Sequence, residues 1–159
     1  MHTPTSLKQK IRHTVIAALP GQLVIQMTDK CNATCPQCSM RITSDFKRNS
    51  LDKNELFRMI DAAARKKIKA ISFTGGEPLL MVDLLCDCMS RAGKKGIPFI
   101  RTGTNGFRFK DSRNPTFRDR ISRLADKLAA TPVRNFWISM DSFVPQVHES
   151  MRGFEGVID

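Results

Sequence analysis

The sequence lacks a long run of apolar residues. No stretch of its 159 residues approaches the ~20 apolar positions that a helix needs to cross a bilayer, so we expect no membrane partner. Near the N-terminus, basic residues precede the short apolar piece TVIAALP, which barely reaches the ~7 residues of a signal-peptide core. The pattern favours an amphipathic helix, so residues 1–21 are predicted to form a helical extension and the protein to be cytoplasmic.

Acidic residues are scarce. Asp and Glu number 15 against 26 Lys and Arg, which leaves a net charge of +11. The positive charge is concentrated between Arg101 and Arg123, where Phe107, Phe109 and Phe117 are interleaved. Such a segment could bind single-stranded RNA, but a solvated basic face is the favoured interpretation because charge alone is a weak functional signal. A nucleic-acid partner is therefore not favoured.

Sequence repeats and low-complexity linkers are also missing, and the composition is that of one globular domain. Buried strands and amphipathic helices alternate along the chain. Four strands are predicted at 22–28, 68–73, 97–106 and 134–141, with helices at 51–67, 79–95 and 115–131 between them. This alternation predicts an α/β fold of parallel βα units.

Residues with known preferences for helix ends support these boundaries. Asp52 followed by Glu55 approximates a capping box, and Gly96 is placed to end the second helix. Asn114 and Pro115 are predicted as the cap and the first residue of the third helix.

The cysteine-rich loop has no fourth cysteine. Cys31, Cys35 and Cys38 lie within eight residues, directly after the first predicted strand. With five cysteines in all and no secretory signal, metal or redox chemistry is more plausible than a disulfide framework. Cys86 and Cys88, in the second helix, are expected to be small buried side chains.

Two kinds of metal centre suit this loop. Three thiolates can hold a cube of four irons at three corners and leave the fourth iron open to a ligand from outside the protein. A zinc site completed by a residue such as His148 is the weaker alternative, since zinc sites favour paired C-x2-C units. Three further polar motifs, GGEP, TNG and SMD, follow the later strands, and parallel α/β folds bind ligands at those strand ends.

These motifs, together with HESMRG near the C-terminus, resemble those of the radical S-adenosylmethionine (radical SAM) enzymes. The resemblance runs from about Gln22 to the end of the chain and is closest to the peptide-modifying, sulfatase-maturating and cofactor-maturating subset. It implies a partial (βα)6 TIM-like barrel, of which about four units are present. Residues 22–159 are therefore expected to be an incomplete core domain.

The resemblance also implies the chemistry. Cys31, Cys35 and Cys38 would bind a [4Fe–4S] cluster whose open iron takes the methionine part of SAM. An electron from an external donor would cleave SAM to a 5′-deoxyadenosyl radical, which abstracts hydrogen from an unidentified substrate. Glu77 would meet the SAM ammonium. The residues expected to bind SAM are Gly75, Gly76, Glu77, Pro78, Thr104, Asn105, Ser139 and Asp141.

The sequence departs from the family pattern at two points. Gln37 precedes the last cysteine of the loop, where the family usually has an aromatic residue beside the adenine. The later βα units have no counterpart, so the chain is expected to be the N-terminal part of an enzyme or to be completed by another subunit. A truncated, non-catalytic iron–sulfur module is the alternative.

Residues beyond the main motifs have plainer interpretations. His148 and Arg152 match the subfamily pattern, although helix capping and local ion pairing would explain them equally well. Trp137 and the methionines are expected in the core and not at the cofactor.

Overall fold

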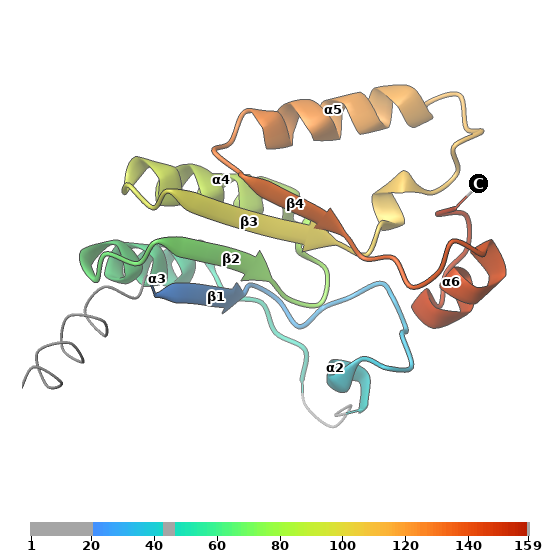
Figure 1. Ribbon diagram of the computed structural model, residues 1–159, viewed down its shortest axis with the longest axis horizontal. Helices are drawn as coiled ribbons and strands as arrows, with labels where there is room; N and C mark the ends of the chain where they lie inside the picture. Colours follow the sequence, from blue (N-terminus) through green and yellow to red (C-terminus); the bar gives the residue numbers. More distant parts are fainter. Residues whose placement is uncertain (1–20, 43–46, 159) are drawn as a thin grey trace, which may run out of the picture.

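The computed structural model describes residues 21–42 and 47–158, and within them a four-stranded parallel sheet (Figure 1). Its strands lie side by side in chain order, and every neighbouring pair is parallel. They are β1 (Gln22–Gln26), β2 (Ala70–Thr74), β3 (Phe99–Thr104) and β4 (Asn135–Ile138). The predicted parallel α/β architecture is confirmed as an open sheet, part of a barrel-like fold. The helical extension predicted at residues 1–21 lies, apart from Gly21, outside the described residues.

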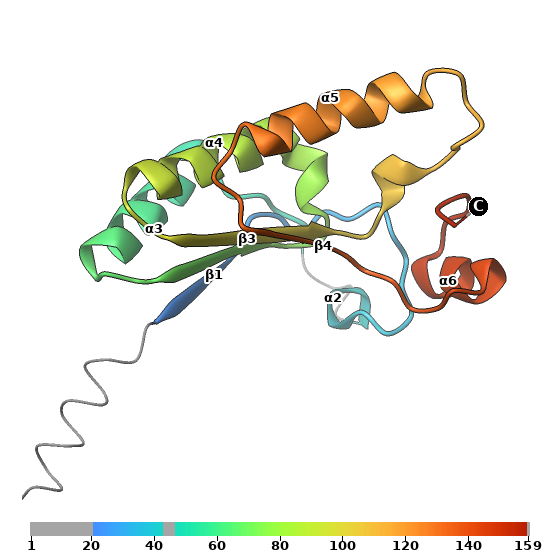
Figure 2. The same ribbon diagram turned by 45° about the horizontal axis from the view of Figure 1, so that its top comes forward.

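Three helices cover one face of the sheet, as Figure 2 shows from above. They are α3 (Lys53–Arg65), α4 (Val82–Lys94) and α5 (Phe117–Ala129). The core between the helices and the sheet holds side chains that are at most 1% exposed, among them Leu56, Ile60, Phe73, Leu85, Met89 and Ile100. A bidentate contact from Arg91 to Asp61, at 2.9 and 2.6 Å, joins α4 to α3.

Local signals set two of the helix ends as predicted. The Asp52 side chain accepts a hydrogen bond from the Glu55 N–H at 2.8 Å, and the Glu55 carboxylate accepts one from the Asp52 N–H at 2.9 Å, so the capping box is confirmed. Gly96 follows α4 with a φ of +80°, a conformation that glycine adopts without the steric cost of a side chain.

The predicted start of the third helix is wrong. Asn114 does not cap it, and the helix begins at Phe117 with Thr116 in the cap position. The Asn114 side-chain oxygen instead accepts hydrogen bonds from the N–H and the hydroxyl of Thr116, both at 2.9 Å. This Asx turn gives the backbone an alternative to a helical first turn.

A short helical segment replaces the beginning of the second predicted helix. A 3-10 turn, Pro78–Met81, precedes α4, because Glu77 accepts the Leu79 N–H and Pro78 suits a first helical position. Another short helix, α2 (Ser39–Ile42), follows directly after the last cysteine of the loop.

The other face of the sheet, called the inner face below, carries both polar and apolar side chains and is not covered by any element of the described part of the chain. Side chains alternate between the two faces of a strand, so each strand presents every second residue here. The inward positions are Gln22, Val24, Gln26, Ala70, Ser72, Thr74, Phe99, Arg101, Gly103, Asn135 and Trp137. The prediction that Trp137 lies in the core is wrong: it is 37% exposed on this inner face.

The methionines and the two helix cysteines divide according to their faces. Met27 and Met89 are core residues as predicted, whereas Met59 and Met140 are exposed and the half-buried Met40 lines the pocket described below, so the prediction for the methionines fails at those three positions. Cys88 is fully buried, and burial raises the pKa of its thiol to about 12. Cys86 is partly buried against the same core, as expected for a small apolar side chain.

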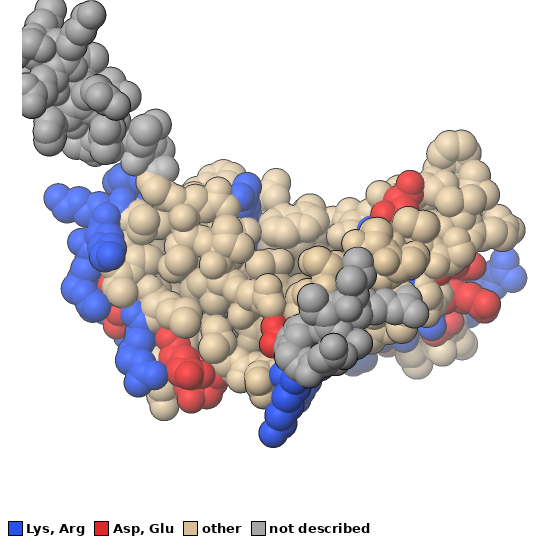
Figure 3. All heavy atoms as spheres, turned by 90° about the horizontal axis from the view of Figure 1, so that it is seen from below, with Lys and Arg blue, Asp and Glu red and all other residues tan. Residues whose placement is uncertain are grey.

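The positive charge is less confined than the sequence indicated. Seen from the β1 side, Lys and Arg gather at one end of the molecule, at left in Figure 3, and the middle of this side is mostly uncharged. That end holds the segments that close α3 and α4, with Arg65, Lys66, Lys67, Lys94 and Lys95. Within the described residues, no helix combines the length and apolar character needed to cross a membrane.

Candidate active site

A pocket of about 590 Å³ opens at the carboxyl ends of the strands. Its walls come from the cysteine loop, the TGGEP segment after β2, the end of β3 and the start of the segment after β4. Of the predicted site residues, the pocket brings together Cys31, Cys35, Cys38, Gly75, Gly76, Glu77, Pro78, Thr104, Asn105 and Ser139. Asp141 does not line it and instead forms an ion pair with Arg152, with 2.7 Å between its Oδ2 and Nε.

The three cysteines differ in their surroundings. Cys35 is buried, Cys38 is half-buried, and Cys31 as a whole residue is exposed. The Sγ of Cys31 accepts hydrogen bonds from the N–H of Ala33 at 3.4 Å and from the side-chain amide of Asn105 at 3.7 Å. Desolvation of this sulfur nevertheless raises the pKa of the Cys31 thiol, and the nearby Glu77 carboxylate adds to the rise. A bound cation would favour the thiolate against both effects.

Backbone packing explains the two glycines of GGEP. A Cβ on Gly75 would lie 2.5 Å from the Thr28 carbonyl oxygen, and one on Gly76 would lie 2.2 Å from that of Lys30. The Gly76 N–H donates to Thr28 O at 2.7 Å, and the Glu77 N–H donates to Lys30 O at 3.0 Å. The glycines therefore allow the TGGEP segment to contact the backbone that leads into Cys31.

The carboxylate of Glu77 is 1% exposed and is held by three protein donors. It accepts hydrogen bonds from the Leu79 N–H and the Thr104 hydroxyl, both at 2.9 Å, and from the Asn105 N–H at 2.7 Å. Burial raises the pKa of Glu77, and these hydrogen bonds lower it in part. Glu77 thus joins the ends of β2 and β3, a role that the sequence did not indicate, and its contact with a ligand ammonium stays a prediction.

The C-terminal segment reaches back to the cysteine loop. Arg152, at the end of α6 (Pro145–Arg152), accepts the Thr34 N–H at 2.9 Å through its carbonyl oxygen. Its Nη1 lies 3.9 Å from the Sγ of Cys35. Gly153 follows with a φ of +73°, and a Cβ there would lie 1.8 Å from the Thr34 hydroxyl oxygen. The local ion pair anticipated for Arg152 is present, but its contact with the cysteine loop was not anticipated.

A model of the radical SAM superfamily matches residues 25–158. The chain belongs to this superfamily. Among its relatives, GTP 3′,8-cyclase of Campylobacter jejuni is 38% identical over 91 residues, which are 56% of this chain and 28% of that protein. Probable GTP 3′,8-cyclase of Thermococcus kodakarensis is 27% identical over 135 residues, 85% of this chain and 39% of that protein. The chain thus spans well under half of these relatives.

Solved structures agree on the fold. SuiB of Streptococcus suis, in a crystal structure with bound S-adenosylmethionine, superimposes with a TM-score of 0.64 at 17% identity. The match covers 94% of this chain and 33% of SuiB. Radical SAM proteins form an enzyme family that uses a [4Fe–4S] cluster and SAM.

The donor set of the loop in this radical SAM chain is three thiols, the ligand type of iron–sulfur clusters. Within residues 21–42 and 47–158, no three His, Cys, Asp or Glu side chains converge on one metal position. His148, the proposed outside ligand for zinc, is 1% exposed and its Nδ1 accepts the Asp141 N–H at 3.2 Å. In a cubane cluster each thiolate binds a different iron, so the three sulfurs surround the cluster and do not meet at one metal atom.

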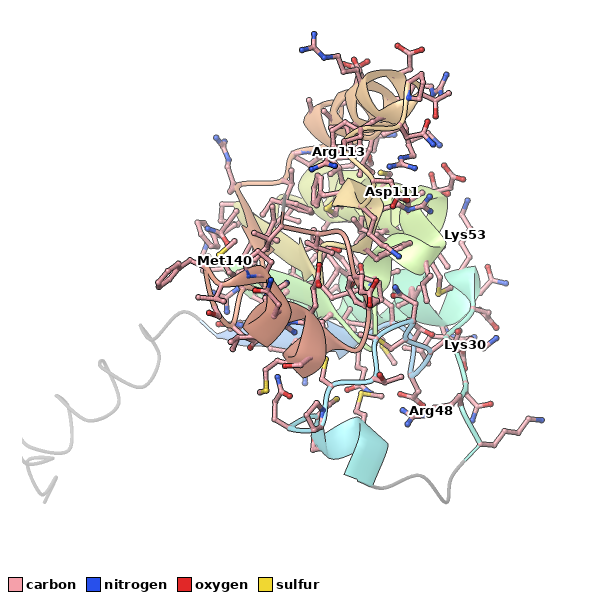
Figure 4. All side chains as sticks on the ribbon, turned by 90° about the vertical axis from the view of Figure 1, so that its right-hand side faces the viewer. Lys30, Arg48, Lys53, Asp111, Arg113 and Met140 are labelled. Atoms are coloured by element: carbon pink, nitrogen blue, oxygen red, sulfur yellow. The ribbon has the colours of Figure 1, made fainter. Side chains whose placement is uncertain are left out.

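Two cations stand beside the cysteine loop of this radical SAM domain, on the side away from Met140 (Figure 4). Lys30 and Arg48 both line the pocket. Arg48 donates to Asp29 O at 3.2 Å and to Met40 O, so it connects the two flanks of the loop. Sequence reasoning missed Arg48, since it lies ten residues beyond Cys38 in a segment without a motif.

Proposed function

We propose that this chain is the cluster-binding and SAM-binding part of a radical SAM enzyme that abstracts hydrogen from its substrate. The observation that carries the proposal is the pocket at the strand ends, where three cysteines of one loop face the GGEP and TNG segments. Cys31, Cys35 and Cys38 would hold a [4Fe–4S] cluster. With SAM on its open iron and an electron from an external donor, the cluster supplies a 5′-deoxyadenosyl radical.

The residues of the chain would hold SAM and orient it. The GGEP and TNG backbones form one wall, and its shape depends on the buried carboxylate of Glu77 and its bonds to Thr104 and Asn105. Ser139, after β4, lines the pocket beside this wall, and its N–H donates to Thr104 O at 2.9 Å. Asp141 would act through Arg152, because their ion pair is placed beside the cysteine loop. Fixing polar groups around the reacting atoms before they react is the protein's usual contribution to such chemistry.

The relatives direct the choice of a first substrate. Relatives of this chain include proteins named GTP 3′,8-cyclase, one of which is 38% identical over 91 residues. GTP is therefore the substrate to assay first in the complete protein. The chain covers 28% and 39% of the two cyclases described above. The part of such a protein that this chain does not cover needs a separate test for residues that select the substrate.

Cluster loading tests the proposal directly. The chain is reconstituted without oxygen using iron, sulfide and a thiol reductant, and iron, acid-labile sulfide and the visible spectrum are measured. We expect a brown protein with an iron–sulfur spectrum, and loss of stable cluster in Cys35→Ala. Cys86→Ala is the matched control, since this cysteine lies on α4 outside the pocket. A full cluster in Cys35→Ala would remove the ligand assignment.

The second measurement concerns SAM. Calorimetry on the reconstituted protein is expected to show SAM binding, and the complete protein with dithionite should form 5′-deoxyadenosine. A chain that binds the cluster but never SAM would instead be a non-catalytic iron–sulfur module.

A further inference from the structure

The inner face of the sheet carries a second hollow next to the candidate active site. It measures about 390 Å³ and is lined by Gln22, Val24, Ser72, Thr74, Arg101 and Trp137. Trp137 lines both this hollow and the pocket at the strand ends. The two spaces therefore adjoin at Trp137 on the inner face, where no described helix covers the sheet (Figure 2).

Arg101 carries the charge of the inner face of the described sheet. The inward positions of the four strands, all of them described, hold no other charged side chain. In the sheet register Arg101 lies between Ser72 on β2 and Asn135 on β4, two neutral polar residues. No carboxylate of the described chain forms an ion pair with it.

The hydrogen bonding of Arg101 separates it from the other partly buried arginines. Its Nε is buried and has no partner, and no described residue accepts a hydrogen bond from its guanidinium. Arg108 and Arg120 also have an unpartnered Nε, but each donates from Nη2 to a backbone carbonyl, of Leu79 and Lys110 respectively. Arg152 is paired with Asp141. Leaving the donors of a partly desolvated cation unmet costs free energy that an arriving anion would recover.

The ring of Trp137 forms the floor between Arg101 and the pocket. It lies flat against Gly103 on the neighbouring strand, since a Cβ there would stand 2.2 Å from the ring atoms Cε2 and Nε1. Gly103 is two residues after Arg101 on β3, a rise of about 6.6 Å along the strand. A molecule reaching from Arg101 to the pocket would therefore pass over an aromatic surface.

We infer that Arg101 is the anchor of a substrate subsite that binds an oxyanion, a carboxylate or a phosphate, while the rest of the substrate crosses Trp137 toward the pocket. A guanidinium presents two parallel N–H donors that match the paired oxygens of either group. The inference depends on the proposed function for its meaning, because the pocket beyond Trp137 is where hydrogen abstraction would take place. Its physical content, an anion site at Arg101, can be measured without cluster or SAM.

The chain provides its own probe. Trp137 is its single tryptophan and the sequence has no tyrosine, so tryptophan emission reports from this hollow and the adjoining pocket, and the Arg101 variants assign the signal to the hollow. The metal-free 159-residue chain is titrated with pyrophosphate and, separately, with succinate at constant ionic strength. We expect a saturable change in emission with at least one anion, and the tighter binder identifies the preferred class of oxyanion.

Variants assign the signal to Arg101. Arg101→Gln should weaken the binding about tenfold or more, as expected when a charge-assisted hydrogen bond is lost. Arg101→Lys keeps the charge but loses the paired donors, so its anion affinity should lie between those of the unmodified chain and Arg101→Gln. Arg118→Gln is the matched control, because Arg118 is exposed on α5 on the helical side of the sheet and should leave the binding unchanged. Circular dichroism checks that each variant is folded; should Arg101→Gln unfold, Arg101→Lys carries the test.

The outcomes separate this inference from the proposed function. If neither anion produces a saturable change, or if Arg101→Gln and Arg101→Lys bind as the unmodified chain does, the subsite is disproved while cluster and SAM binding stand on their own measurements. If the anion binds through Arg101 but the reconstituted chain binds no SAM, the anion site stands and the proposed function fails.

Discussion

The guanidinium of Arg152 lies 3.9 Å from the Sγ of Cys35, although 117 residues separate them in the chain. The same arginine is paired with Asp141 at 2.7 Å, and its side chain is only 13% exposed. Its carbonyl oxygen also accepts the Thr34 N–H. The contacts of Arg152 with Cys35 and Thr34 hold the middle of the cysteine loop in position.

Removing the charge of Arg152 should weaken the cluster site. We expect Arg152→Gln to release iron to a chelator about tenfold faster than the unmodified protein, because residues that orient metal ligands typically contribute 10- to 100-fold to metal affinity. Iron release is followed by the decay of the visible spectrum. Arg152→Lys, which keeps the positive charge, should recover part of the loss. Arg118 is exposed and distant from the loop, so Arg118→Gln is the control. If it releases iron equally fast, the net charge of the chain and not the contact with Cys35 is responsible.

Glu77 should matter for SAM more than for the cluster. Glu77→Ala removes a buried acceptor of three hydrogen bonds, so the GGEP and TNG walls lose their connection. We expect SAM affinity to fall by about 1.5–3 kcal/mol, the usual loss for a charge-assisted hydrogen bond, while iron and sulfide content stays unchanged. Calorimetry on the reconstituted protein measures the affinity. Glu55→Ala, which removes a carboxylate from the start of α3, is the control, and unchanged affinity in Glu77→Ala would rule out this role.

The same carboxylate predicts a pH dependence of stability. Burial raises the pKa of Glu77 above its ordinary value of 4.5, so the folded chain holds this proton more tightly than the unfolded chain. The resulting stabilisation is fully present below pH 4.5 and is lost as the pH rises through the folded pKa. Urea unfolding at a series of pH values should show the unmodified chain losing stability relative to Glu77→Gln across this window. If the stability of the unmodified chain relative to Glu77→Gln stays constant or rises with pH, the raised pKa is contradicted.

The outer edge of β4, which pairs with no further strand of the described residues, predicts how the chain behaves alone. Ile138 is 48% exposed on this strand, and Met140 and Phe143 just beyond it are 63% and 86% exposed. A site on the rim of such an open sheet has little wall on one side to exclude water. We expect residues 1–159 to form little or no 5′-deoxyadenosine with SAM and dithionite, whereas the complete protein forms it readily. A monomeric 159-residue chain that cleaves SAM at an ordinary enzymatic rate would end the view that it is part of a larger core.

Much of the architecture could be predicted from local signals. The apolar periodicity of α3 and its capping box act within a few residues, so the sequence alone determined where that helix begins. The three cysteines occupy one loop of eight residues, and their common location follows from their spacing. Parallel strands ending in polar motifs also predict that those motifs share an edge, because the carboxyl ends of such strands lie together.

Only the tertiary structure decided the contacts between distant segments. Trp137 was misplaced because a short, mostly apolar strand does not show which face is buried, whereas pairing with Gly103 sets it on the open side. Thr104 and Asn105 meet the carboxylate of Glu77 across 27 and 28 residues, and Arg152 meets Cys35 across 117. Periodicity and capping act over one or two turns, while these contacts exist only once the sheet register brings the strand ends together.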